Sequence, residues 1–354
     1  MGLIRLESGL TRDDFAMQVV AWQRTSGRNN LPWQNTRDPY RVWLSEIMLQ
    51  QTQVSTVLDY FPRFLARFPD VESLSAATLD DVLALWSGLG YYSRARNLHR
   101  CSLEVMNVHA GAFPQTALAL ETLPGIGRST AAAIASLCFS ERVAILDGNV
   151  KRVLTRVLGF DADLALAAGE RRLWDEATKL LPKTDFEQAM PRYTQGLMDL
   201  GATLCTTHNP GCGVCPLQDD CVARRLGQPD RYPVKSRKIK RTSQSIWLLW
   251  ARAGDLSVLL TKRPVPGVWA GLYCFPLFDS LEALEESVPA NLRSTMEFAP
   301  AVSHVLTHKD LLLHPARVIL DRKDWAASPC MWATAEQWQR LGLPAPIRKL
   351  LAGE

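Results

Sequence analysis

The spacing of hydrophobic positions is helical through the first part of the chain. The clearest amphipathic stripe comprises Val150, Val153, Leu154, Val157 and Leu158. This i, i+3, i+4, i+7 spacing lines one face of a helix. A further helix is predicted over Ser129–Cys138, because that run is rich in alanine, the strongest helix former. We therefore predict an all-α region over residues 1–223.

After residue 241 the apolar residues occur in short runs bounded by turn residues. Ser245–Trp250 and Leu256–Thr261 are predicted to form a β-hairpin, and Leu311–Leu320 a further strand. We expect Pro315 to interrupt that strand, since proline has no N–H to donate. Residues 242–354 are therefore predicted to form a smaller α/β domain.

Residues 224–241 combine glycine and two prolines without an apolar period, which predicts a linker. This segment has eight basic residues and one acidic residue. Residues 1–223 have 21 basic and 24 acidic residues, and residues 242–354 have 11 of each. The net charge of +4 therefore originates in the linker. A localised basic segment favours nucleic-acid binding only weakly, because a solvated linker fits equally well.

The composition, 47% hydrophobic and 21% charged, is typical of a soluble globular protein. No stretch approaches the ~20 apolar residues that a membrane helix needs, and the first residues lack the apolar core of an export signal. Eight cysteines in 354 residues are too few for a secreted fold held by disulfides. We expect a cytoplasmic monomer that makes no membrane contact.

Four of the cysteines are concentrated in one short segment. They are Cys205, Cys212, Cys215 and Cys221, in the pattern C-x6-C-x2-C-x5-C. Four thiolates this close can hold one [4Fe–4S] cluster, with each sulfur binding one iron. Zinc is the alternative, although zinc sites of four cysteines usually pair two short knuckles. The sequence Asn-Pro-Gly at 209–211 predicts a loop, which argues against ordinary core cysteines.

The segment Leu123-Pro124-Gly125-Ile126-Gly127 separates two predicted helices. Its two glycines would let the backbone turn tightly, and the helix that follows begins with free N–H groups. Such a turn can hold a DNA phosphate, although a plain helix–helix turn is the default interpretation.

Two acidic residues have unlike predicted surroundings. Glu46 shares a helical face with large apolar residues, including Val42 and Trp43, so burial should raise its pKa as a general acid requires. An exposed helix glutamate is the alternative. Asp147 precedes the next helical stripe, where aspartate commonly caps N–H groups, and these donors would keep it ionised. Capping alone explains Asp147 equally well, but one protonated and one ionised carboxyl would suit N-glycosidic hydrolysis.

Five motifs occur in an order typical of one enzyme family. They are SEIMLQQTQV, GLGYYSRARNLH, LPGIGRSTA, LDGNVKRVL and the cysteine pattern. Over essentially the whole chain they resemble the MutY family of adenine glycosylases, within the endonuclease III or helix-hairpin-helix superfamily. The resemblance implies an all-α helix-hairpin-helix glycosylase domain with an iron–sulfur cluster and a C-terminal α/β Nudix-like domain. The implied bounds are a six-helix lobe at about 31–146, a cluster lobe at about 1–30 and 147–223, a basic interdomain linker at 224–241, and an 8-oxoguanine recognition domain at 242–354.

The resemblance also implies a reaction and its residues. Adenine paired with 8-oxoguanine or guanine in double-stranded DNA would be flipped into a pocket and removed. Glu46 would protonate adenine N7, Asp147 would stabilise the oxocarbenium sugar, and Asn149 would hydrogen-bond nearby. The base pocket would be lined by Trp33, Leu49, Ser129 and Gln195. Ser129 stands where strand-cleaving relatives carry a lysine, and a hydroxyl cannot form a Schiff base, so we expect base excision without strand cleavage.

Contacts with DNA are implied for several further residues. Those expected to touch DNA or the opposite 8-oxoguanine are Gln51, Thr52, Leu89, Tyr91, Gly125 and Gly127. In the C-terminal region Leu306-Thr307-His308 matches a family loop of the form F-S-H, so Thr307 and His308 would contact 8-oxoguanine. The carboxylate helix of active Nudix hydrolases has no match, so we expect no pyrophosphatase activity. The alternatives are an endonuclease III-like pyrimidine glycosylase with AP lyase activity and a non-catalytic iron–sulfur DNA-binding protein.

Overall fold

The computed structural model describes residues 12–236, 241–321 and 330–353. The chain divides into two compact units, one formed by Met1–Ser73 and Arg100–Lys238 and the other by Leu74–His99 and Ile239–Glu354. Residues 1–11 of the predicted cluster lobe and 237–240 of the predicted linker lie outside the described residues.

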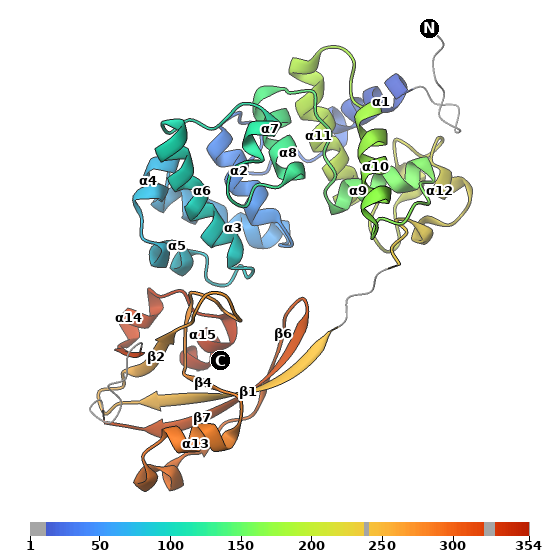
Figure 1. The fold of residues 1–354 in the computed structure, drawn as a ribbon. Coiled ribbons are helices and arrows are strands. Elements are labelled where there is room, and N and C mark those ends of the chain that lie inside the picture. Colours follow the sequence, from blue (N-terminus) through green and yellow to red (C-terminus); the bar gives the residue numbers. More distant parts are fainter. Residues whose placement is uncertain (1–11, 237–240, 322–329, 354) are drawn as a thin grey trace. The chain divides into compact units, whose positions relative to one another are not determined.

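The described residues of the first unit form helices, turns and loops, as the hydrophobic pattern predicted (Figure 1). The helices are α1 (Arg12–Ser26), α2 (Pro39–Leu49), α3 (Val54–Arg67), α7 (Ala117–Leu120), α8 (Arg128–Phe139), α9 (Gly148–Leu158), α10 (Ala167–Lys179), α11 (Phe186–Thr203) and α12 (Val222–Arg225), with 3-10 turns at Cys212–Val214 and Pro229–Arg231. Helices α4 (Val71–Ala76) and α6 (Ser93–His109) contribute residues to both units.

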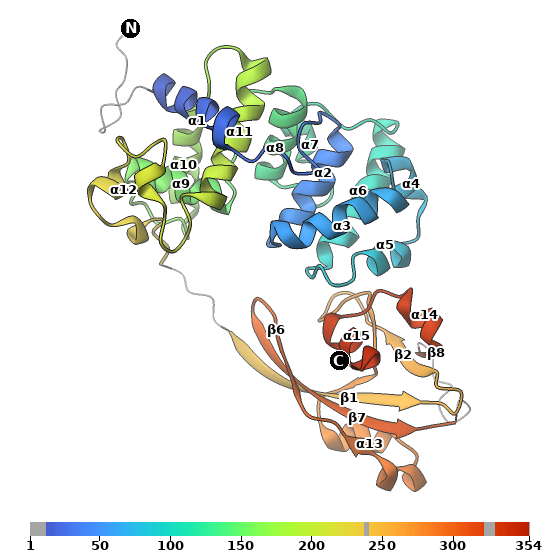
Figure 2. The same ribbon diagram turned by 180° about the vertical axis from the view of Figure 1, so that it is seen from behind.

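Helix α11 is central to the first unit and packs against α1, α8 and α9 (Figures 1 and 2). The predicted stripe of α9 is confirmed, because Val150, Val153, Leu154 and Val157 are all buried. Gly201 lets α11 approach α9 closely, since a Cβ at that position would lie 2.5 Å from the Cβ of Asn149. This packing places the beginning of α9 beside α11, where the candidate site is found.

Local sequence signals explain where the site-bearing helices begin. Asp38 accepts a hydrogen bond from the Tyr40 N–H at 2.9 Å, and Pro39 occupies the first turn of α2. Helix α8 begins after Gly127, which has no side chain to cap it. Helix α9 begins at Asp147, which accepts from the Val150 N–H at 2.7 Å.

The second unit contains helix α5 and a mixed sheet (Figure 1). Its elements are α5 (Leu79–Leu85), β1 (Thr242–Arg252), β2 (Val258–Lys262), β3 (Tyr273–Cys274), β4 (Leu277–Phe278), α13 (Leu281–Ser287), a 3-10 turn (Ala290–Thr295), β5 (Glu297–Phe298), β6 (Val302–Val305), β7 (Lys309–Ile319), β8 (Cys330–Ala333), α14 (Ala335–Gln339) and α15 (Ala345–Ala352). The sheet order is β3-β2-β1-β7-β5, with β4 beside β1, β6 beside β7 and β8 beside β2. Strands β1 and β2 pair antiparallel, which confirms the predicted hairpin.

The long strands β1 and β7 pair in parallel, from Thr242 opposite Lys309 to Arg252 opposite Ile319. The expectation that Pro315 interrupts the third predicted strand is wrong, because β7 continues through it. The carbonyl of Pro315 accepts from the Ala299 N–H at 2.9 Å, between β5 and β6. The N–H and C=O of a strand residue point to the same side, so the missing donor of Pro315 faces the gap between these short strands and no ladder bond is lost.

The segment predicted as an interdomain linker is partly folded against the first unit. The Leu164 N–H donates to the carbonyl of Val234 at 3.0 Å, and Arg156 Nε donates to the carbonyl of Pro229 at 2.9 Å. Ser236 also hydrogen-bonds the carboxylate of Asp163. These contacts use backbone carbonyls and polar side chains, which leave no apolar period in the sequence. In the part of the chain that the structure describes, no helix is long and apolar enough to cross a membrane.

Candidate active site and metal centre

A cavity of about 930 Å³ lies in the first unit. Its walls come from the loop before α2, the end of α2, the first turns of α8 and α9, and one side of α11. The wall includes the predicted site residues Trp33, Glu46, Leu49, Gln51, Thr52, Ser129, Asp147, Asn149 and Gln195. Residues far apart in the sequence therefore meet around one space of the size that small-molecule and base-binding sites commonly have.

Glu46 lies on the cavity wall contributed by α2, and its helical neighbours Ser45 and Ile47 are buried. Burial raises the pKa of Glu46 to about 7, and the nearby charge of Asp147 acts in the same direction. Among the described residues, no group donates a hydrogen bond to the Glu46 carboxylate. The carboxyl therefore keeps its proton near neutral pH, as its apolar neighbours led us to expect.

Asp147 caps α9 as expected, and the donors that the prediction counted act against the effect of its burial. Burial raises the pKa of the Asp147 carboxyl, while the N–H groups of Val150 and Asn149 and the charges of Arg152 and Lys151 lower it. The prediction counted the donors and missed the burial, which is the larger effect. The donors nevertheless distinguish Asp147 from Glu46, and the charge of Asp147 is one cause of the high pKa of Glu46.

Asn149 is held by Arg152, a contact that the sequence did not indicate. Arg152 Nη2 donates to Asn149 Oδ1 at 2.8 Å and to the carbonyl of Gly201 at 2.7 Å. Its Nε donates to the carbonyl of Cys205 at 2.7 Å. Arg152 is thus engaged within the protein and joins Asn149 of the cavity wall to the backbone of the first cysteine of the predicted metal site.

Ser129 lies in the first turn of α8, and its Oγ accepts from the Leu146 N–H at 3.1 Å. The preceding turn differs in one respect from the expectation that both of its glycines are needed for backbone geometry. Gly125 has a φ of +78°, a conformation that favours glycine. Gly127 has a φ of −88°, and a Cβ there would meet no atom within 4 Å. The backbone conformation at Gly127 therefore does not require glycine, and its contact with DNA stays a prediction.

The four clustered cysteines line one small cavity together with Arg156. All four are free thiols, and Arg156 Nη1 donates to Cys205 Sγ at 3.4 Å. The N–H of Leu217 donates to the sulfur of Cys215, and the N–H groups of Arg224 and Ala223 donate to that of Cys221. In the described residues, no three Cys, His, Asp or Glu side chains gather closely enough to hold a single metal ion. The segment thus offers four sulfurs with hydrogen-bond donors around one space.

The remaining predicted contacts lie in the second unit. Leu89 is buried in this structure, whereas Tyr91 is 44% exposed and has a φ of +49°, and their contacts with DNA stay predictions. Thr307 Oγ1 donates to the Tyr91 hydroxyl at 3.2 Å, and His308 is exposed. Two of the residues expected to contact 8-oxoguanine, Tyr91 and Thr307, are therefore neighbours although they are far apart in the sequence.

One residue of the wall was not recognised as such from the sequence. Lys235 of the predicted linker lines the cavity, and it forms no ion pair with any of the described acidic residues. Lys235 reaches the cavity because residues 224–236 pack against the rest of the first unit. A high density of basic residues in a segment was the available signal, but it could not single out Lys235.

Comparison with known proteins agrees with this geometry. Residues 44–179 match the HhH-GPD superfamily of base excision DNA repair proteins, and residues 246–353 match the NUDIX domain. The chain is 35% identical over 353 residues to the adenine DNA glycosylase of Buchnera aphidicola subsp. Acyrthosiphon pisum (strain APS), which covers 97% of this chain and 98% of that protein. It is 32% identical over 401 residues to the adenine DNA glycosylase of Mus musculus, covering 95% and 77%. A solved structure of a thermostable thymine-DNA glycosylase aligns with a TM-score of 0.53 and 26% identity over 61% of this chain and 97% of that one.

Proposed function

Because this chain belongs to the adenine DNA glycosylase family, we propose that its cavity removes adenine paired with 8-oxoguanine or guanine in double-stranded DNA. The enzyme is a hydrolase of base excision repair, with a helix-hairpin-helix glycosylase unit and a Nudix-like C-terminal domain. The observation that carries the proposed mechanism is that Glu46 and Asp147 line the same cavity with different hydrogen-bond surroundings.

Departure of the base begins with protonation of the flipped adenine. The Glu46 carboxylic acid donates its proton to N7 of adenine, so the electrons of the C1′–N9 bond leave with a neutral base. A pKa of about 7 leaves much of Glu46 protonated at neutral pH. Trp33 and Leu49 on the same wall supply apolar surface against the base.

The positive charge left on the sugar is stabilised by the Asp147 carboxylate. Its capping bond to the Val150 N–H at 2.7 Å holds the carboxylate at the start of α9. The Glu46 carboxylate, now deprotonated, accepts a proton from the water that attacks C1′, which restores the acid for the next cycle. Ser129 has no amine, so no Schiff base forms at that position and the strand remains intact.

We place the opposite 8-oxoguanine against Tyr91 and Thr307 of the second unit. Thr307 Oγ1 donates to the Tyr91 hydroxyl, so its lone pairs remain available as acceptors. The N7–H of 8-oxoguanine is a donor that guanine lacks. Thr307 therefore favours adenine opposite 8-oxoguanine over adenine opposite guanine.

We assign one [4Fe–4S] cluster to Cys205, Cys212, Cys215 and Cys221. The residues fit this group because the four cysteines line one space and three of their sulfurs, those of Cys205, Cys215 and Cys221, receive hydrogen bonds from Arg156 or from backbone N–H groups. A cluster is larger than a single ion, and each sulfur binds a different iron, so the sulfurs need not converge on one point. Held by these cysteines, a cluster would cross-link the start of α12 to the loop after α11. We expect about four irons and four acid-labile sulfides per chain, lost in Cys215→Ser but kept in Cys101→Ser, which alters a buried cysteine elsewhere.

The function is tested by single-turnover incubation with duplexes that hold adenine opposite 8-oxoguanine, guanine or thymine. We expect base release in the order 8-oxoguanine, guanine, thymine, with strand breaks only after alkali. Breaks without alkali would support the lyase alternative, and binding without base release would support a non-catalytic role. Thr307→Val should lower the preference for 8-oxoguanine over guanine several-fold, and an unchanged preference would contradict the role given to Thr307.

A further inference from the structure

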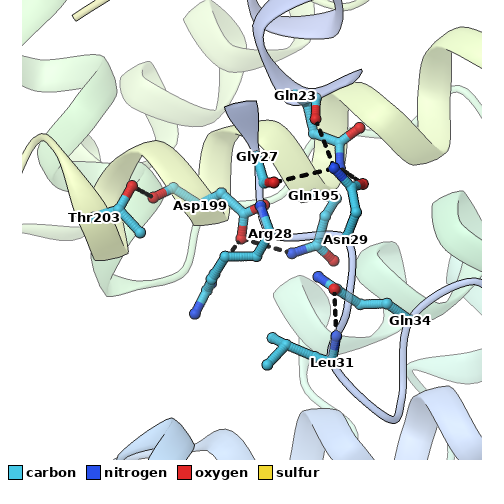
Figure 3. Close-up of polar contacts among 9 residues, drawn as sticks. All are labelled: Gln23, Gly27, Arg28, Asn29, Leu31, Gln34, Gln195, Asp199 and Thr203. Atoms are coloured by element: carbon cyan, nitrogen blue, oxygen red, sulfur yellow. Dashed lines mark hydrogen bonds and ion pairs between the residues drawn. The ribbon is translucent and has the colours of Figure 1, made fainter. Parts of the chain in front are cut away.

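A further carboxylate, that of Asp199 on α11, lies next to Gln195 of the cavity wall and takes no part in the proposed proton transfers (Figure 3). Its side chain is fully buried. Arg28 Nε donates to Asp199 Oδ1 at 2.6 Å, and the Arg28 N–H donates to Oδ2 at 2.9 Å. Gln195 Nε2 donates to Oδ1 at 2.9 Å. The carboxylate is thus paired with a cation and satisfied by donors on both oxygens, which holds it in one orientation.

The contact with Asp199 determines which end of the Gln195 amide reaches the cavity. A side-chain amide can turn over, and its two ends are a donor and an acceptor of similar size. An ion-paired carboxylate accepts hydrogen bonds and cannot donate them, so only the NH2 end of Gln195 can face Asp199. Gln195 lines the cavity, and its carbonyl oxygen is the end left for a ligand. In Figure 3 Gln195 lies between Asp199 and the loop that carries Leu31 and Gln34.

Gln34 on that loop has its amide fixed in the opposite sense. Its Oε1 accepts from the Leu31 N–H at 3.1 Å, which leaves Nε2 as the free end. That Nε2 is buried and has no hydrogen-bond partner among the residues that the structure describes, although Gln34 lines the cavity. A buried donor without a partner is costly and points to a ligand that supplies an acceptor. The cavity thus presents one acceptor, from Gln195, and one donor, from Gln34.

We propose that Asp199 is a positioning residue that makes the site specific for 6-aminopurines, by holding the Gln195 carbonyl oxygen toward the cavity to accept from the exocyclic amino group. The Gln34 amide then donates to the adjacent ring nitrogen N1. Hypoxanthine, a 6-oxopurine, has an acceptor at position 6 and a donor at N1, the reverse of adenine. The inference rests on the proposed function, because it assumes that the base enters this cavity.

The test compares single-turnover excision of adenine and of hypoxanthine, each opposite 8-oxoguanine in otherwise identical duplexes. The ratio of the two rates, measured on one preparation, does not depend on the fraction of enzyme that is folded. We expect the full-length protein to favour adenine by at least ~100-fold. In Asp199→Asn the new amide can donate as well as accept, so Gln195 is free to turn over. The ratio should fall at least ~10-fold.

A second experiment exchanges the amide of Gln195 and the carboxylate of Asp199. Gln195→Glu alone places two carboxylates together and should lower adenine excision ~10-fold or more. In the double variant Asp199→Asn/Gln195→Glu, the amide introduced at position 199 can donate to one oxygen of the new carboxylate, and the other oxygen again faces the cavity as an acceptor. The double variant should therefore recover most of the preference for adenine that each single variant loses.

The matched control is Thr194→Val on the same helix, which removes a buried hydrogen bond to Ser136, 2.6 Å long, without touching Gln195. It should lower the thermal stability but leave the adenine-to-hypoxanthine ratio unchanged. An unchanged ratio in Asp199→Asn, or a double variant no better than Gln195→Glu alone, would overturn the inference. Absence of adenine release by the unaltered protein would instead contradict the proposed function.

Discussion

Helices α2 and α11, which both contribute to the cavity wall, each carry a carboxylate, and the two are surrounded differently. Glu46 on α2 is partly buried and receives no hydrogen bond from the described residues, and burial raises its pKa to about 7. Asp199 on α11 is fully buried, but it is paired with Arg28 and bonded to Gln195. The same functional group thus becomes a proton donor on one wall and a fixed acceptor on the other. What differs is the set of donors that the fold brings to each carboxylate.

The largest expected effect comes from removing the proton donor. Glu46→Gln keeps the shape of the side chain but cannot protonate the base, so single-turnover adenine release should fall roughly 10³-fold. Glu187→Gln is the matched control, because Glu187 also lines the cavity but is exposed and paired with Arg37. A comparable loss in Glu187→Gln, or a loss below tenfold in Glu46→Gln, would contradict the assignment of the acid.

The pH dependence tests how the two carboxylates act on each other. The Glu46 pKa is raised, so the active acid form is present below about pH 7 and the rate should fall about tenfold per pH unit above it. Asp147→Asn removes the charge that is the second cause of this shift, so the inflection of its residual activity should move to lower pH. Rates measured between about pH 5 and 9 for both proteins provide the comparison, and an inflection that stays in place would mean that the two groups do not interact.

The same raised pKa has a consequence for stability. A carboxyl whose pKa is higher in the folded protein than in the unfolded chain contributes stability below its unfolded value and loses that contribution as the pH rises through about 7. Glu46→Gln should therefore be more stable than the unaltered protein at about pH 8, by about 1–3 kcal/mol. Urea unfolding at about pH 5 and pH 8 measures this, and the gain should be smaller at the lower pH.

A smaller effect is expected from a substitution that disturbs the close packing between α9 and α11. The methyl group in Gly201→Ala would meet Asn149 at 2.5 Å and should displace it, costing about 1–3 kcal/mol of stability and roughly a tenfold loss of excision. Gly254→Ala is the control, since an added Cβ there meets no atom within 4 Å. Equal effects of the two substitutions on excision would show that the close approach at Asn149 is unimportant.

The smallest effect is expected from replacing Lys235, which lines the cavity but forms no ion pair with the described carboxylates of Glu46 and Asp199. Lys235→Ala should weaken DNA binding a few-fold and lower the slope of the binding constant against salt by about one. Lys179→Ala is the matched control, because Lys179 is paired with Glu176 away from the cavity. Binding titrations at several salt concentrations would reveal an unchanged slope, and that result would remove Lys235 from the DNA interface.

The features that local sequence predicts and those that it misses differ in a physical way. The stripe of α9, the apolar surroundings of Glu46 and the cap at Asp147 depend on residues within a few positions of each other, so the sequence indicates them. Asp199 cannot be recognised in this way, because its partner Arg28 lies 171 positions away and meets it only through the packing of α1 against α11. The burial of Asp147, which raises the pKa of its carboxyl, was missed for a similar reason, since burial depends on distant elements.

The strand through Pro315 and the fold of residues 224–236 also depend on contacts between residues that are distant in the sequence, so local sequence could not predict them. A proline in a strand is harmful only if its missing N–H faces a partner strand, and that depends on where β5 and β6 end. The predicted linker folds through single carbonyl and hydroxyl contacts, such as those to Val234 and Ser236. Neither kind of contact produces a hydrophobic period.

The central claim is that Glu46 carries a proton near neutral pH because burial and the nearby charge of Asp147 both raise its pKa. Its most direct test is the titration of the Glu46 carboxyl by difference infrared spectroscopy, with Glu46→Gln subtracted to identify its band. We predict a midpoint near pH 7 in the unaltered protein and a lower midpoint in Asp147→Asn. A midpoint near 4.5, the ordinary value for a glutamate, would contradict the account.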